Sequence, residues 1–145
     1  MTSFDYHSST RLVFGAGKID TLSELVAELG GSRILLISDP GVIQAGHTDR
    51  AVTALRQASL EVEVFGNVQE NPTTADVAAG CQLAEQFRPD LLIGLGGGSS
   101  MDCAKGINFI YTNGGEMKDY WGTGKASQPM LPMIAIPTTA GTGSE

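Results

Sequence analysis

The chain has 145 residues, a length that suits one domain with a single hydrophobic core. Its 9 basic residues against 16 acidic ones leave a net charge of −7, which argues against nucleic acids and anionic membrane surfaces as partners. No apolar run is long enough for a membrane span, the start lacks a signal-peptide pattern and two cysteines give no disulfide framework, so we expect a cytoplasmic protein.

Apolar segments alternate with helical patterns along the chain. Strand character is found, in chain order, at residues 10–14, 34–37, 62–65, 91–95 and 132–137, the last expected to be buried. Helical stripes lie between them: over 19–29, around 52–58, from a capping box at 73–76, and from a similar start at 99–102. Residues 112–132 form either an ordered excursion or a mobile loop.

This alternation predicts an α/β fold. The spacing of about thirty residues between the central strands is typical of βαβ units, so we expect a Rossmann-like parallel sheet with helices on both faces, in one domain over residues 1–145. The carboxyl ends of parallel strands lie along one edge of the sheet. We therefore expect the residues that follow the strands to contact the same ligand. They are Asp39, Asn71, Gly96 and Thr138.

Three glycines, Gly96, Gly97 and Gly98, follow the apolar run 91–95, where a strand turns into a helix that carries Ser99. Without Cβ atoms they let the backbone approach an anion closely, and the free N–H groups and positive dipole end of the helix face it. The turn therefore predicts a phosphate site, with Gly96, Gly97, Gly98 and Ser99 as candidate cofactor-binding residues. Such turns also occur for steric reasons alone, and the motif by itself leaves that interpretation open.

Two motifs carry a resemblance to a known family. GGGSSMDCAK at 96–105 and PTTAGTGSE at 137–145 resemble the iron-containing, group III alcohol dehydrogenases, whose relatives include glycerol dehydrogenases and, more distantly, dehydroquinate synthases. The segment 14–17, Asp39 and Asn71-Pro72 fit the same family. The resemblance covers the whole chain but only the amino-terminal part of such an enzyme. It implies a dehydroquinate synthase-like amino-terminal domain, truncated.

The resemblance also implies a reaction. Members of the family transfer hydride directly between an alcohol or aldehyde and NAD, with a divalent metal, iron or zinc, acting on the alcohol oxygen. One aspartate and three histidines hold that metal on a helical second domain, which lies beyond the end of this chain. We therefore expect an NAD-binding portion that is inactive alone. A non-catalytic nucleotide-binding remnant and a relative of dehydroquinate synthase or glycerol dehydrogenase are the alternatives.

Polar residues near the glycine turn are the candidate cofactor contacts. The resemblance implies that Asp39 selects NAD, because its carboxylate accepts hydrogen bonds from ribose hydroxyls and repels the extra phosphate of NADP. The local alternative is a turn residue within 38–41. Turn chemistry is also the alternative for the candidate phosphate, ribose and adenosine contacts, which are Asn71, Thr138, Thr139, Thr142 and Ser144.

Asp102 is the candidate catalytic residue. In the family an aspartate at its position lies close to the nicotinamide and the substrate, which implies an auxiliary role. Read locally, Asp102 is the third-position partner of a Ser99 helix cap. Lys105, one turn further on, is interpreted as a solvated helix lysine.

Neither thiol nor imidazole chemistry is expected from this chain. Cys103 lies near a helix start, where a thiol pKa can fall, but no base lies near it in the sequence, so we do not expect a nucleophile. His7 and His47 have no partner at metal-ligand spacing and are interpreted as surface residues. No metal site is predicted within the chain.

Association is expected through the start of the chain. In the family the region of Thr10–Phe14 resembles a strand that pairs between subunits, and an unpaired apolar edge invites such pairing. Apolar surface around Ile134 and Ile136 is also expected to be open. We therefore expect the chain to form a homodimer. The other expected partner is a small-molecule substrate, an alcohol or an aldehyde.

Overall fold

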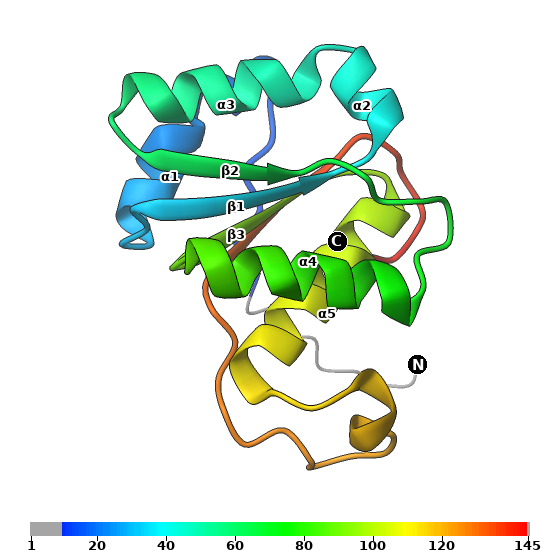
Figure 1. The fold of residues 1–145 in the computed structure, drawn as a ribbon. Coiled ribbons are helices and arrows are strands. Elements are labelled where there is room, and N and C mark those ends of the chain that lie inside the picture. The colour runs from blue at the N-terminus through cyan, green and yellow to red at the C-terminus, as the bar shows by residue number, and fades with distance from the viewer. Residues whose placement is uncertain (1–9, 145) are drawn as a thin grey trace, which may run out of the picture.

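A computed structural model describes residues 10–144 and shows a parallel sheet flanked by helices (Figure 1). The four strands are β1 (Arg33–Ser38), β2 (Glu61–Phe65), β3 (Leu91–Gly96) and β4 (Met133–Pro137). They lie in the order β2-β1-β3-β4, and every neighbouring pair is parallel. The predicted Rossmann-like α/β sheet is confirmed.

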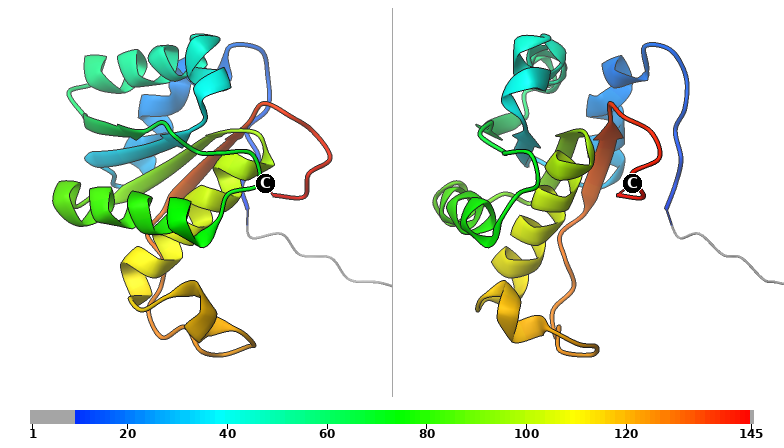
Figure 2. Two further views of the ribbon diagram at one scale, coloured as in Figure 1. Left: turned by 45° about the vertical axis from the view of Figure 1, so that its right-hand side comes forward. Right: turned by 90° about the vertical axis from the view of Figure 1, so that its right-hand side faces the viewer.

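Helices cover both faces of this sheet (Figure 2). One face carries α1 (Leu22–Glu28), α2 (Pro40–Gln44) and α3 (His47–Gln57). The other carries α4 (Thr74–Phe87) and α5 (Gly98–Asn113). Two short 3₁₀ helices, η1 (Lys18–Thr21) and η2 (Met117–Tyr120), complete the described part. The capping box at Thr73 and Asp76 is confirmed, whereas α2 replaces the turn considered at 38–41.

The core consists of two clusters separated by the sheet. Ile34 and Leu36 of β1 pack with α1 and α3, whereas Leu35 and Ile37 face α4 and α5, and all four side chains are buried. Burial on both faces explains why the central strands are continuous apolar runs rather than alternating ones. A glycine lets α5 lie close to the sheet, because a methyl group on Gly94 of β3 would come 3.3 Å from Cα of Met101.

Two strand expectations need correction. β4 forms where predicted but is not buried, because within residues 10–144 it is an edge strand paired with β3 alone, and Ile134 and Ile136 on it are half-buried. Residues 10–14 form no strand in this chain by itself, and Leu12 and Phe14 are 85% and 92% exposed. The dimer stays a prediction.

Residues 112–132 form an excursion that extends from the end of α5 and makes contacts back to it. The side-chain oxygen of Asn113 accepts hydrogen bonds from the backbone N–H groups of Ser127 and Gln128 at 3.0 and 2.9 Å. The hydroxyl of Tyr120 donates to the carbonyl of Asn113 at 2.9 Å, and its ring meets Phe109 edge-on at 4.7 Å. These contacts hold the excursion at the end of the sheet opposite the glycine turn (Figure 1).

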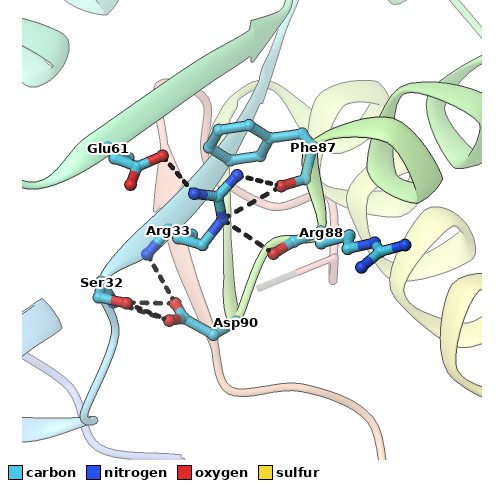
Figure 3. Close-up of polar contacts among 6 residues, drawn as sticks. All are labelled: Ser32, Arg33, Glu61, Phe87, Arg88 and Asp90. Atoms are coloured by element: carbon cyan, nitrogen blue, oxygen red, sulfur yellow. Dashed lines mark hydrogen bonds and ion pairs between the residues drawn. The ribbon is translucent and has the colours of Figure 1, made fainter.

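Arg33 ties the amino ends of three strands to the end of α4 (Figure 3). Its guanidinium donates to the carbonyl oxygen of Phe87 at 2.5 Å and to that of Arg88 at 3.3 Å, and it lies 4.7 Å above the Phe87 ring. It also pairs with Glu61 at the start of β2. Helix carbonyls at the end of α4 thereby obtain partners that the helix itself does not provide.

Asp90 makes the stability of this end of the sheet dependent on pH. Burial raises the pKa of Asp90, but hydrogen bonds from the Ser32 hydroxyl, the Arg33 N–H and the Ser32 N–H outweigh it and lower the pKa below its ordinary 3.8. A carboxyl with a lowered folded-state pKa stabilises the fold above its unfolded pKa, and that contribution is lost as the pH falls through the folded value.

We therefore expect Asp90→Asn to lower the melting temperature at about pH 7, and the difference from wild type to shrink as the pH falls below about 3.8, the ordinary pKa of this carboxyl in the unfolded chain. Thermal melts of both proteins across this range are the measurement. Glu63→Gln, at an exposed position of β2, is the control and should show neither effect. A deficit for Asp90→Asn of the same size at neutral pH and below this pKa would contradict the expectation.

Candidate functional site

The carboxyl ends of β1, β3 and β4 meet at one edge of the sheet. The N–H of Thr138, just after β4, donates to the carbonyl of Gly96 at the end of β3 at 2.8 Å. The hydroxyl of Ser100, in the first turn of α5, donates to Oδ2 of Asp39 just after β1 at 3.0 Å. The structure therefore brings together segments that are about 40 and 60 residues apart in sequence.

The segment between β2 and α4 also reaches this edge. The backbone N–H of Asn71 donates to the hydroxyl of Ser99 at 3.2 Å, and Asn71 has a left-handed backbone with φ 54°. Asparagine tolerates this conformation better than most residues. All the strand-end residues expected to converge thus lie around the start of α5.

The glycine turn leaves the start of α5 without a side-chain cap. The N-cap is Gly97, no side chain accepts from the first N–H groups, and the helix begins at Gly98. The expected cap at Ser99 is therefore wrong, because the helix starts earlier than the Ser–x–x–Asp pattern suggested and Ser99 is already helical. Gly96 has φ +150°, a backbone conformation that other residues rarely adopt.

A loop after β4 folds back over this helix start (Figure 2). A methyl group on Gly97 would lie 3.5 Å from the Thr139 hydroxyl, and one on Gly98 would lie 3.1 Å from Cβ of Thr142. Ser144 is buried, and its carbonyl accepts a hydrogen bond from Nζ of Lys105 at 2.5 Å. The loop hydroxyls thus lie beside the backbone N–H groups at the start of α5.

The Asp39 carboxylate has two hydrogen-bond partners. Its Oδ1 accepts from the N–H of Val42 at 3.1 Å, as the N-cap of α2, and its Oδ2 accepts from Ser100. A methyl group on Gly96 would lie 2.7 Å from the same Oδ2, so the carboxylate is directly above the first glycine of the turn. Each carboxylate oxygen retains further acceptor capacity.

Asp102 and Lys105, in the next turns of α5, do not have the local roles that the sequence suggested. Asp102 is exposed and lies 3.9 Å from Nζ of Lys105, without a capping role. Lys105 is not simply solvated, because its ammonium group holds the carbonyl of Ser144. Sequence patterns carried no sign of this contact or of the Ser100 contact, since each joins segments that only the sheet brings together.

The cysteines are buried and free. Burial raises the pKa of Cys81 to about 11 and that of Cys103 to about 12, and a thiol with such a pKa is not a nucleophile at neutral pH. His47 begins α3 and is exposed, whereas His7 lies outside the described residues. Among residues 10–144, no three His, Cys, Asp or Glu side chains are grouped as metal ligands, and no helix is long and apolar enough to cross a membrane.

Comparisons with known proteins agree with this geometry. The family model of iron-containing alcohol dehydrogenase matches residues 9–145. Alcohol dehydrogenase 4 of Schizosaccharomyces pombe is 41% identical over 133 residues, which cover 92% of this chain and 32% of the relative. The 1,3-propanediol dehydrogenase of Citrobacter freundii is 37% identical over 144 residues, covering 98% and 37%. The chain thus spans about a third of the length of these relatives.

Solved structures give the same result. The crystal structure of a 1,3-propanediol oxidoreductase matches with a TM-score of 0.91 and 35% identity, over 99% of this chain and 38% of that one. A sulfoacetaldehyde reductase from Bifidobacterium kashiwanohense, solved in complex with NAD+, matches with a TM-score of 0.88 and 30% identity, over 100% and 38%. The described part therefore has the fold of the amino-terminal part of these proteins.

Proposed function

Since the chain belongs to the iron-containing alcohol dehydrogenase family, we propose that it forms the NAD-binding part of an enzyme that transfers hydride between an alcohol or aldehyde and NAD. The observation that carries the proposal is the uncapped start of α5 at the Gly96–Gly98 turn, beside the hydroxyls of the loop after β4. The sulfoacetaldehyde reductase, which is 30% identical to this chain, was solved in complex with NAD+, and this supports NAD as the dinucleotide.

The start of α5 would hold the pyrophosphate. The N–H groups of Gly98 and Ser99 have no side-chain acceptor there, and the helix dipole favours an anion at this end. We propose that a set of hydroxyl groups around this helix start forms hydrogen bonds with the phosphate and ribose oxygens. They belong to Ser99, Thr138, Thr139, Thr142 and Ser144, with Asn71 placed toward the adenosine.

Hydride chemistry needs more than these residues. NAD, when bound, supplies the hydride acceptor at its nicotinamide, and this chain's share is to bind and orient it. Residues 10–144 bring no three candidate metal ligands together, so no metal-dependent step is assigned to them. Asp102, exposed on α5 beyond the glycine turn, is proposed as an auxiliary residue near the nicotinamide.

Calorimetric titration of the protein with NAD tests the proposal directly. We expect saturable binding at one site per chain. Absence of binding at millimolar NAD, in a chain that melts cooperatively, would contradict the proposed function.

Asp39 should set the preference for NAD over NADP. Replacing it by Asn removes the charge that repels a ribose 2′-phosphate but keeps an acceptor for the Val42 N–H, so α2 stays capped. We expect Asp39→Asn and Asp39→Gly each to lower the ratio of the NADP to the NAD dissociation constant by about tenfold or more. Titrations with both dinucleotides measure this ratio. If the ratio changed in Asp39→Gly but not in Asp39→Asn, the effect would come from loss of the helix cap, and the Asp39 charge would have no role in choosing the cofactor.

A further inference from the structure

Ser100 is a buried polar residue that the proposed cofactor contacts do not use. Its side chain is 0% exposed, although it lies in the first turn of a helix that begins at the site. A buried hydroxyl is costly unless it has a hydrogen-bond partner. The partner here is Oδ2 of Asp39, 3.0 Å away and 61 positions earlier in the chain.

The surroundings of this contact hold the carboxylate from two sides. The Val42 N–H binds Oδ1 of Asp39 at 3.1 Å while Ser100 binds Oδ2. A methyl group on Gly96 would lie 2.4 Å from the Ser100 hydroxyl and 2.7 Å from Oδ2. The first glycine of the turn therefore provides the space in which the serine and the carboxylate meet.

We infer that Ser100 is a positioning residue that holds the Asp39 carboxylate in one orientation at the glycine turn and so strengthens the discrimination between NAD and NADP. The inference rests on the proposed function. With both oxygens bound, the carboxylate cannot rotate away from a ligand, and its charge stays where it opposes a second phosphate on the ribose. Without the Ser100 hydroxyl, only Oδ1 is held, and the carboxylate can turn away from that phosphate.

The neighbouring serine offers a matched control. Ser99 lies one residue earlier in the same helical turn, but its hydroxyl accepts from the N–H of Asn71, whereas the described hydrogen bonds to the Asp39 carboxylate come from Val42 and Ser100. Loss of the Ser99 hydroxyl should therefore affect both dinucleotides alike, because Ser99 lies in the first turn of α5, where we propose that the pyrophosphate common to both is held.

The test is a double-mutant cycle read as the ratio of the NADP to the NAD dissociation constant. We expect Ser100→Ala to lower this ratio about fivefold in the wild-type background. In the Asp39→Asn background it should leave the ratio unchanged, because the charge that Ser100 positions is then absent. Ser100→Thr, which keeps a hydroxyl, should restore the ratio, and Ser99→Ala should leave the ratio unchanged. Melting temperatures establish that each variant is folded.

The outcomes separate the two proposals. A wild-type chain that binds NAD, together with a Ser100→Ala variant of unchanged ratio, would overturn the positioning role and leave the proposed function standing. An equal change of the ratio in the wild-type and Asp39→Asn backgrounds would also overturn it, because Ser100 would then act independently of the carboxylate. A folded wild-type chain that binds neither dinucleotide would overturn both.

Discussion

Gly97→Ala is expected to weaken NAD binding by about 1–3 kcal/mol, which corresponds to a loss of roughly 5- to 150-fold in affinity. The new methyl group would point toward Thr139, into the space between the glycine turn and the loop where we place the pyrophosphate. The protein itself has room for it, since the nearest atom is 3.5 Å away and the backbone of Gly97 (φ −78°, ψ −172°) is open to any residue.

Calorimetric titration with NAD and a thermal melt of the same variant form the test. The affinity should fall while the melting temperature stays at the wild-type value. Gly98→Ala is the matched comparison, because its methyl group would lie 3.1 Å from Cβ of Thr142 and should displace the loop, reducing affinity and melting temperature together. Full-strength NAD binding by Gly97→Ala would show that no ligand approaches the turn closely and would remove the main support for the proposed function.

Gly80→Ala is expected to destabilise the fold by about 1–3 kcal/mol, the usual range for overpacking a core. Gly80 lies on α4, where that helix packs against α5, and a methyl group there would lie 2.2 Å from Cδ1 and 2.6 Å from Cγ1 of Ile107. Ile107 is fully buried and cannot move aside freely. The higher helix propensity of alanine, about 1 kcal/mol, offsets part of this cost, so we expect the lower half of the range.

Urea denaturation measures the change in the free energy of unfolding. Ile107→Val removes the Cδ1 atom that is nearest to the new methyl group and should by itself cost about 0.5–1.5 kcal/mol. The double variant should then be more stable than the sum of the two single changes implies, because the deletion relieves the overlap. Strict additivity would show that the cost of Gly80→Ala does not come from this contact.

Much of the fold could be predicted from local pattern. The central strands are continuous apolar runs, and the segment from Thr73 to Asp76 is a capping box, so these elements are specified within a few residues. The errors about the strands fall where neighbours decide. The strand at Met133–Pro137 is apolar enough to be buried, but its exposure depends on what lies on its far side, where no strand of residues 10–144 pairs with it. Residues 10–14 have strand composition, but they form no strand in the described chain.

At the candidate site the sequence by itself determined where the glycine turn lies and which residues follow the strands, because parallel strands joined by helices place their carboxyl ends together. Only the tertiary structure decided which side chains touch. Ser100 reaches Asp39, and Lys105 reaches Ser144, across 61 and 39 positions of the chain. Such contacts have no local pattern, because they depend on strand order and on how closely α5 packs against β3, and these are properties of the assembled sheet.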